Sequence, residues 1–444
     1  MKFHVEGIYD AKALGIPQML ILGLQHMFAM FGATILVPIL VNTYFHGEGL
    51  SIQVTLFCAG FGTLLFHVLT KMKVPAFLGS SFAFLGGYAT VANLDTGIFA
   101  DMTYGEKLPY ACGGVVVAGL LYLVLALIIK LIGVKRVMRY LPPVVTGPII
   151  ICIGLSLAPS AISNASQNWL LAIIALATVV IFNIWGMGMF RIIPILMGIV
   201  ISYAAALIMN MLGMTNADGS AILNFAGAAS APVIGIPDFF VCKFNITAVL
   251  AMAPIAIASM MEHVGDMSAI SATVGRNFIE DPGLHRSLLG DGLATSLSAF
   301  IGGPANTTYG ENTSVLALSR VYDPRVIRLA AVYAIALSFI PKMAELIGSL
   351  PSAIIGGISF ILYGMISAVG IRNVVENQVD LMIPRNLMIV AVILVCGLGF
   401  SGGLTFNIAG TSITLTSLAL AAIAGILLNA ILPGNEYEFN SGES

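Results

Sequence analysis

The sequence predicts an all-α, polytopic membrane protein, and two observations lead to this fold class. Of the 444 residues, 58% are hydrophobic, only 9% are charged and the mean hydropathy is +0.99, so the chain lacks the polar surface that a soluble protein of this size needs. Apolar stretches of roughly 20 residues, each long enough to cross a bilayer as a helix, follow one another from Ile16 to Pro433. Together they predict fourteen transmembrane segments.

The first predicted span is a retained helix rather than a removed signal peptide, because it contains Gln25 and His26 and no small-residue cleavage site follows it. The third and tenth spans are unusual: both are short, begin at a proline and are rich in Gly, Ser and Thr. The fourteen predicted spans are residues 17–41, 51–70, 74–93, 109–133, 141–162, 169–188, 192–213, 247–270, 287–302, 304–320, 327–349, 351–370, 386–402 and 413–432.

The basic residues support this count and set the orientation. With the N-terminus in the cytoplasm, all of the nineteen Lys and Arg residues except Lys107, Lys243 and Lys342 fall on the cytoplasmic side, as the positive-inside rule requires. An error of one span would reverse the side of every later loop. We therefore expect a multi-pass protein of the cytoplasmic (inner) membrane with both termini in the cytoplasm.

Two pairs of short segments resemble each other, which indicates internal symmetry. "LQHMFAM" (24–30) resembles "MEHVGDM" (261–267) at an offset of 237 residues, which relates the first span to the eighth. "PAFLGSSF" (75–82) resembles "PANTTY" (304–309) at an offset of 227, which relates the third span to the tenth. Because each half then holds an odd number of spans, the second half enters the membrane upside down. The sequence predicts an inverted repeat of seven plus seven spans.

The third and tenth spans carry matched breaks, and the repeat aligns Phe82 with Tyr309. Irregular backbone is tolerated at membrane depth only where protein or a water-filled cavity surrounds it. We expect each segment to run extended and then turn helical, so that a helix N-terminus points at a ligand site. The alternative is that the small residues only allow close helix packing. The breaks are Pro75, Gly79, Gly86 and Gly87 in one span and Gly302, Gly303, Pro304 and Gly310 in the other.

Ionisable side chains inside the spans are few, and such groups usually mark a substrate or proton path. Glu262 and Asp266 are four residues apart and share a helical face, whereas His263 points about 100° away and is predicted to pack or to form hydrogen bonds. For Glu262 and Glu311 the structural alternative is a hydrogen-bonded staple between helices. The full set is His26, His67, Glu262, His263, Asp266, Asp291 and Glu311.

Asp291 has two equally weighted interpretations, as a functional acid and as a partner for the broken backbone of the tenth span. We predict a structural role for His26 and an interfacial position for His67. Carboxylates accept hydrogen bonds and free backbone N–H groups donate them. A planar heterocycle that alternates N–H and C=O, such as a pyrimidine or purine base, fits this pattern, with Phe82, Tyr309 or Tyr363 against its face.

Several motifs resemble the nucleobase–ascorbate (nucleobase:cation symporter-2) family, and most closely its bacterial uracil permeases. The resemblance runs from about Gly15 to Leu432. It implies short strands in spans three and ten, and a core domain that moves against a gate domain. The motifs are "LQHMFAMFGATILVPIL", "VPAFLGSSFAF", "EHVG", "DPGLHRSLLGDGL", "NTTYGENTSVLALSRVY" and "GGISFILYGMISAVGIR".

The resemblance also implies domain boundaries and a homodimer. The core domain comprises residues 1–140 and 247–350, the gate domain comprises 141–246 and 351–433, and residues 434–444 form a cytoplasmic tail.

The resemblance further implies roles for individual residues. Glu262 accepts hydrogen bonds from the uracil ring, the backbone N–H groups of Phe82 and Gly310 hold its carbonyls, and Glu311 is a second essential carboxylate. Tyr309 and Tyr363 shape the pocket. Proton coupling is assigned to Asp266, Glu262 and Glu311, with support from Asp291, His26 and Asn312.

The chain departs from the family pattern at several positions. Ser314 and Ser319 replace a Gly and a Thr of the family signature, which are mild changes. Asp266 stands where uracil permeases carry a histidine and xanthine carriers an aspartate, and Asp291 is also typical of purine carriers. Glu311 favours uracil, because xanthine carriers usually have glutamine there.

We therefore predict a proton-coupled uracil symporter, with a xanthine or other purine symporter as the alternative. A channel would not accumulate substrate, and a membrane-embedded hydrolase would need a nucleophile and base or a metal motif that "EHVGD" does not provide. The chain has no phosphate-binding loop, no metal-type cysteine spacing and a net charge of only −2. We accordingly predict a non-enzyme without cofactors, whose partners are uracil, protons and membrane lipid but no nucleic acid.

Overall fold

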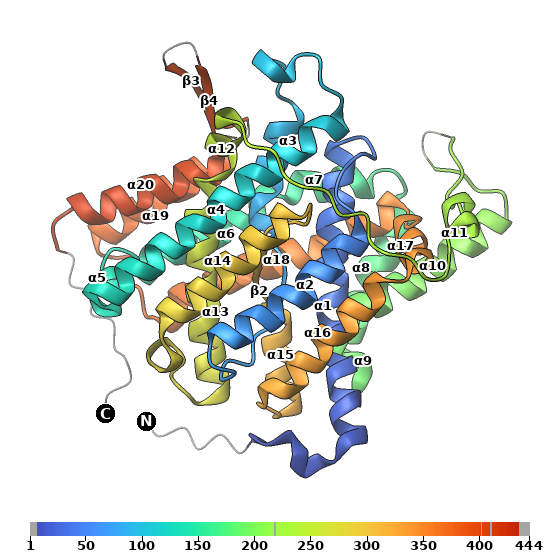
Figure 1. The fold of residues 1–444 in the computed structure, drawn as a ribbon, viewed down its shortest axis with the longest axis horizontal. Coiled ribbons are helices and arrows are strands. Elements are labelled where there is room, and N and C mark those ends of the chain that lie inside the picture. The colour runs from blue at the N-terminus through green and yellow to red at the C-terminus, as the bar shows by residue number, and fades with distance from the viewer. Residues whose placement is uncertain (1–6, 217–218, 401, 409–410, 435–444) are drawn as a thin grey trace.

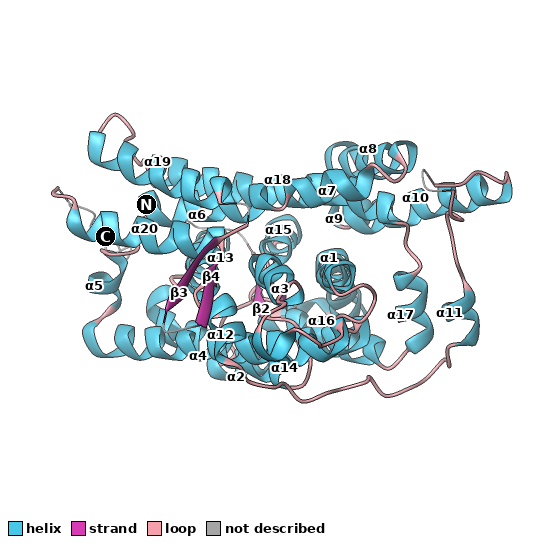
Figure 2. Ribbon diagram, turned by 90° about the horizontal axis from the view of Figure 1, so that it is seen from above, coloured by secondary structure: helices cyan, strands magenta, loops and turns pink. Residues whose placement is uncertain are grey.

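The computed structural model describes residues 7–216, 219–400, 402–408 and 411–434. The described chain is mainly helical and contains two short β-ladders. Its helices pack as two sets, which face each other in the view of Figure 2. Figure 1 shows the same helices from the side, with most of the long ones running obliquely through the molecule.

The first helical set contains the first helices of the chain and those of the third quarter, which pack against one another. Its contacts join α4 to α14, α2 to both α14 and α16, and α1 to α16. Its members are α1 (Ile16–Tyr44), α2 (Ile52–Leu69), α3 (Leu85–Ala92), α4 (Tyr104–Ile132), α12 (Ile246–Met252), α13 (Ile255–Val274), α14 (Leu284–Phe300), α15 (Gly310–Ser319) and α16 (Pro324–Ser338).

The second helical set packs around α18, and it meets the first set where α13 touches α6 and α20 and where α1 touches α10. Its members are α6 (Pro143–Ser156), α7 (Ala158–Ala165), α8 (Trp169–Trp185), α10 (Pro194–Met211), α18 (Ser352–Glu376), α19 (Pro384–Gly399) and α20 (Ser417–Ile431). The remaining short helices are η1 (Ala11–Leu14), η2 (Phe82–Phe84), η3 (Gly97–Phe99), α5 (Val134–Met138), α9 (Met189–Ile192), α11 (Ala226–Ser230), η4 (Ile279–Gly283) and α17 (Pro341–Gly348).

Seven helices of the described chain are long and apolar enough to cross a membrane, or eight if α16 and α17 count as one span bent by 87°. Every predicted span overlaps at least one helix, so the predicted polytopic helical fold is confirmed. Several of the other segments are shorter apolar helices, such as the one over Phe82–Ala92. Fourteen crossings therefore remain a prediction.

Glycines allow the helices within each set to approach closely. A Cβ added to Gly60 of α2 would lie 2.4 Å from the carbonyl oxygen of Ala331 in α16, and one added to Gly154 of α6 would lie 2.2 Å from that of Tyr363 in α18. Such contacts are how helices pack in a membrane, where apolar burial alone supplies little attraction between them. Both sets use them.

The two broken spans cross as a short antiparallel ladder. Strand β1 (Leu78–Ser80) pairs with β2 (Asn306–Thr308), with Gly79 opposite Thr307. The ladder is extended by Ser81 N–H, which donates to the Ala305 carbonyl at 2.8 Å, and by Tyr309 N–H, which donates to the Phe77 carbonyl at 3.0 Å. These bonds satisfy the extended backbone inside the protein, as membrane depth demands.

The ladder has a local two-fold axis at its central pair, Gly79 and Thr307, which relates the strands by an offset of 228. The resemblance between the two sequences used an offset of 227. The inverted repeat itself stays a prediction. The resemblance between serines and threonines in the two segments could not fix this register, because the side-chain types repeat at neighbouring positions.

A second hairpin was not predicted. Strands β3 (Leu404–Ile408) and β4 (Thr411–Leu415) pair antiparallel, and helix α20 begins only at Ser417. The fourteenth predicted span started at 413 and so included part of β4. The three β-branched residues in "TSITL" are typical of a strand, but the segment lies next to an apolar run and was assigned to the predicted span.

Candidate functional site

A cavity of about 210 Å³ lies between the two helical sets, beside the crossing strands. The first set contributes the region of η2, helix α13 and the β2–α15 segment, and the second contributes α6 and α18. The lining residues are Phe82, Ile150, Glu262, Asp266, Ala269, Thr273, Thr307, Thr308, Tyr309, Gly310, Glu311, Thr313, Ser314, Ala317, Met365, Ile366, Val369 and Arg372.

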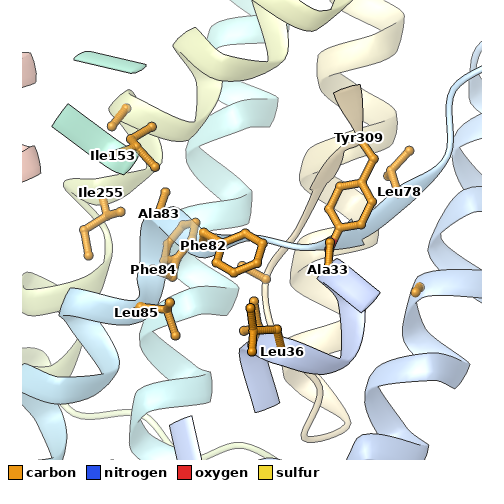
Figure 3. Close-up of a cluster of buried hydrophobic side chains, with 14 of the residues drawn as sticks. Ala33, Leu36, Leu78, Phe82, Ala83, Phe84, Leu85, Ile153, Ile255 and Tyr309 are labelled. Carbon is orange, nitrogen blue, oxygen red and sulfur yellow. The ribbon is translucent and has the colours of Figure 1, made fainter. Parts of the chain in front are cut away.

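Two helix starts meet at this cavity. Helix η2 begins at Phe82 directly after β1 and leads into α3, while α15 begins at Gly310 after β2. The first backbone N–H groups of a helix have no intrahelical acceptor, and neither start has a side-chain cap. Figure 3 shows Phe82 and Tyr309 at the ends of the two strands, with Ala33 and Leu36 of α1 nearby. The site can therefore offer backbone donors from two directions.

Three carboxyl groups line the same cavity. Glu262 and Asp266 lie one turn apart on α13, and Glu311 lies in the first turn of α15. Asp266 Oδ2 accepts a hydrogen bond from Thr308 Oγ1 at 2.8 Å, whereas Glu262 Oε2 is buried without a partner among the described residues. The arrangement leaves an acceptor available for a ligand N–H group. The prediction that Glu262 and Asp266 share one helical face is confirmed.

Tyr309 forms a fixed wall of the site. Its ring is almost fully buried, and its hydroxyl donates to the Ser80 carbonyl oxygen at 2.9 Å. Tyr363 does not line the cavity, but its ring packs edge-on against Phe82, with centroids 6.0 Å apart and an interplanar angle of 74°. It therefore acts on the site only through the position of Phe82.

Asp291 lies behind the cavity rather than in it. Its Oδ2 is 2.9 Å from His263 Nδ1, and both side chains are fully buried. His263 Nε2 is 3.0 Å from Ser287 Oγ. The partner of Asp291 is thus a histidine of α13, not the broken backbone of the tenth span, while the hydrogen-bonding role predicted for His263 is confirmed. This network joins α13 to α14 on the side of α13 away from Glu262.

His26 and Asn312 also lie outside the cavity lining. Asn312 Nδ2 donates to the His26 carbonyl oxygen at 3.0 Å and lies 3.2 Å from His26 Nδ1. Both residues are buried, and the contact fastens α15 to α1. The structural role predicted for His26 agrees with this position. His67 is also buried, with Nε2 2.9 Å from the Ala76 carbonyl oxygen. It lies in the last turn of α2, and its interfacial position stays a prediction.

Sequence reasoning assigned Tyr363 of α18 to the pocket but missed Arg372 of the same helix, which lines the cavity. The positive-inside rule had used Arg372 only as a marker of a cytoplasmic loop. A clue was present: Met365, Ile366 and Val369 precede Arg372 at helical spacing, so one face of a single helix carries three apolar residues and then a cation. Within the described chain, no three His, Cys, Asp or Glu side chains are grouped as metal ligands would be.

Comparison with known proteins gives extensive similarity along the chain. The model of the permease family matches residues 17–405. The uracil permease of Bacillus caldolyticus is 42% identical, with 98% of this chain and 96% of that protein covered. The uracil permease of Bacillus subtilis is 40% identical, with 92% and 91% covered. The putative pyrimidine permease RutG of Escherichia coli is 37% identical, with 95% and 91% covered.

Solved structures of low sequence identity share the fold. The transmembrane domain of the cyanobacterial bicarbonate transporter BicA is 14% identical and superposes with a TM-score of 0.60 over 96% of this chain and 99% of that domain. SLC26A9 is 13% identical and gives a TM-score of 0.68 over 95% of this chain and 66% of its own. Because the permease model and these relatives match nearly the whole sequence, the chain belongs to the permease family, the nucleobase–ascorbate transporters.

Proposed function

We propose that this chain imports uracil across the cytoplasmic membrane together with protons. The observation that carries the proposal is an unpaired, buried carboxylate oxygen of Glu262 in a cavity where two uncapped helix starts converge. Uracil presents N–H donors and carbonyl acceptors along one edge, which is the complement of that set. The relatives named as uracil permeases support the same substrate.

Recognition follows from the hydrogen-bonding capacity of each group. Glu262 accepts from the ring N–H groups of uracil, and the backbone N–H groups of Phe82 and Gly310 donate to its carbonyls. The local two-fold axis at Gly79 and Thr307 relates these two donors to each other at an offset of 228. Tyr309 closes the wall, and Tyr363 holds the Phe82 ring from behind.

Proton coupling is assigned to the three acids of the cavity, Glu262, Asp266 and Glu311. Burial disfavours the charged form of a carboxyl group, so a cluster of acids can carry a proton with the substrate and release it on the other side. Asp291, His26 and Asn312 support this cluster by fixing α13 and α15 to their neighbours.

Transport by this fold requires two bodies. The first helical set corresponds to a core domain of residues 1–140 and 247–350, and the second to a gate domain of residues 141–246 and 351–433. Fourteen spans in two inverted halves account for the two-fold relation of β1 and β2. The loaded core moves against the gate, both termini lie in the cytoplasm, and two chains associate as a homodimer.

The test is uptake of labelled uracil by cells that lack their own uracil carriers. Expression of the chain should give uptake that unlabelled uracil inhibits strongly and that falls when the proton gradient is dissipated. Glu262→Gln and Glu311→Gln should abolish it, whereas Glu280→Gln, which changes an exposed glutamate outside the cavity, should not. Normal uptake by both cavity variants would refute the site.

The alternative substrate is xanthine or another purine, which Asp266 favours because purine carriers resemble this chain at that position. Both classes offer the N–H and C=O edge that Glu262 and the backbone donors require. Competition separates them: stronger inhibition by xanthine than by uracil would assign the purine.

A further inference from the structure

Arg372 places a positive charge opposite the acids of the cavity. It is the last residue of the stripe that α18 turns toward the cavity, and its side chain is 56% exposed. Its Nε lies 3.5 Å from Glu376 Oε1, one turn further along the helix. The guanidinium is thus at the mouth of the cavity, in contact with water and only loosely paired.

The region of α18 around Arg372 approaches α13 at the level of Asp266. A Cβ added to Gly265 would lie 3.4 Å from Ile150 Cδ1 of α6 and 3.9 Å from Asn373 Nδ2 of α18. Asp266 and Arg372, the neighbours of Gly265 and Asn373 in sequence, both line the cavity and interact electrostatically across it. The acid belongs to the first helical set and the cation to the second.

The cavity extends toward the C-terminal ends of three helices. Thr273 is near the end of α13, Ala317 near the end of α15 and Arg372 near the end of α18. Ser314 and Ala317 are exposed. At this end of the molecule, the Ile8 N–H donates to the Arg320 carbonyl, so the cavity opens on the side of the N-terminal segment.

Other charges around Asp266 are mainly acidic. Glu262 on its own helix, Glu311 on α15 and Asp291 on α14 all act on this group of acids, and Asp291 is paired with His263. The helices α6 and α20, which also pack against α13, carry no charged side chain. Arg191 of α9, beside α15, does not line the cavity. Helix α4 brings charges only near its ends, at Glu106, Lys107 and Lys130.

We propose that Arg372 is a positioning residue for proton release: it stabilises the Asp266 carboxylate while the cavity is open on this side, so that the proton leaves here. In this step the O–H bond of the Asp266 carboxylic acid breaks, its electron pair stays on the carboxylate, and the proton passes to water in the cavity. The guanidinium then faces the new negative charge. The inference rests on the proposed function, because it explains where that transport cycle discharges its proton.

Because Arg372 lies on the opposite helical set from Asp266, its stabilisation of the Asp266 carboxylate depends on how the two sets are arranged. Movement of the first set relative to the second changes the separation of Asp266 and Arg372, so the carboxylate has its counter-charge in one arrangement and lacks it in the other. By linkage, a charge that is stabilised in one arrangement only makes proton binding depend on that arrangement. Arg372 needs no contact with uracil to do this.

The experiment compares two transport modes in proteoliposomes. Counterflow exchanges labelled for unlabelled uracil without net proton release, whereas uptake driven by a proton gradient requires release in every cycle. The variants are Arg372→Gln, Arg372→Met and Arg372→Lys, and the matched control is Arg136→Gln, which removes an exposed cation distant from the cavity lining. Thermal unfolding in the presence of uracil is measured for each.

We expect Arg372→Gln and Arg372→Met to keep counterflow within about twofold of the parent and to lose about tenfold in driven uptake, the change that one unit of proton affinity produces. An alkaline lumen should restore their driven uptake, because release is then helped by the low proton concentration. Arg372→Lys and Arg136→Gln should retain driven uptake.

Three results would overturn the inference: equal loss of both modes, no loss of driven uptake, or no recovery with an alkaline lumen. Arg372→Met duplicates Arg372→Gln so that misfolding of one variant does not decide the outcome. Absence of uracil counterflow in the parent protein would overturn the proposed function, and with it this inference.

Discussion

Replacement of Gly79 by alanine tests the structure where the two broken spans cross. A Cβ at this position would lie 2.4 Å from Tyr309 Cζ, 2.5 Å from Tyr309 Cε2 and 2.8 Å from Thr34 Oγ1. Carbon atoms in good contact are about 3.5–4.0 Å apart. The aromatic ring must therefore move by about 1 Å or more, away from the position in which its hydroxyl bonds to the Ser80 carbonyl oxygen.

The cost has two parts. Overpacking of a buried site destabilises by about 1–3 kcal/mol, and loss of the Tyr309 hydrogen bond to Ser80 removes about 1 kcal/mol more. The reduced freedom of the unfolded chain offsets about 0.5 kcal/mol. We expect Gly79→Ala to lower the free energy of unfolding by roughly 2 kcal/mol and to weaken uracil binding, because Tyr309 precedes the donor Gly310.

Gly86→Ala is the matched control. Gly86 lies seven residues further along in α3, is exposed, and has no atom within 4 Å of the position that a Cβ would take. Alanine there should raise stability by about 0.5–1 kcal/mol, as it does in helices. Thermal unfolding in detergent and uracil binding are measured for both variants. Equal stability of the two, or normal uracil binding by Gly79→Ala, would refute the reasoning.

Three further variants test other parts of the structure. Asn312→Ala removes the link between α15 and α1 and should cost about 1–3 kcal/mol of unfolding free energy while the Km for uracil stays unchanged; a large change in Km would place Asn312 in the site. Asp291→Ala removes the partner of His263 Nδ1 and should cost about 3 kcal/mol in chemical unfolding; an unaltered midpoint would contradict the pairing. Lys73 Nζ donates a hydrogen bond to Asp281 Oδ1 at 2.7 Å, and this bond lowers the pKa of the exposed Asp281 carboxyl. The ion pair therefore stabilises the protein fully at neutral pH. This stabilisation is lost as the pH falls through the lowered pKa. The melting temperature of Asp281→Asn should accordingly be slightly below that of the parent at neutral pH and equal to it in strong acid. A difference in melting temperature that persists in acid would argue against the ion pair.

The sequence predicts those parts of the site whose residues are energetically unfavourable in the hydrocarbon of a membrane. Prolines and glycines in apolar spans and the acids Glu262, Asp266 and Glu311 are costly in hydrocarbon, so each one signals a cavity. All three acids, together with Phe82, Tyr309 and Gly310, line one cavity. The prolines, glycines and acids could be recognised because a membrane helix bundle without a ligand site does not need them.

The parts that could not be predicted depend on geometry that involves no residue unfavourable in a membrane. The register of β1 and β2 is set by backbone hydrogen bonds, and neighbouring serines and threonines carry no information about it. Basic residues such as Arg372 are common at the ends of membrane helices, so its charge alone does not indicate that it lines the cavity. The turn between α16 and α17 and the β3–β4 hairpin lie in segments whose hydropathy is that of an ordinary span.

The crossing of β1 and β2 has a consequence for how the protein can change over evolution. Both helix starts and all three acids belong to one packed body. In the proposed transport cycle, a bound base would therefore keep its hydrogen bonds to these groups while that body moves. Substitutions on the faces of α18 and α6 that do not line the cavity can then change the rate of that movement without changing which base is bound. The rate of transport and the choice of base can therefore change through substitutions at different surfaces of the protein.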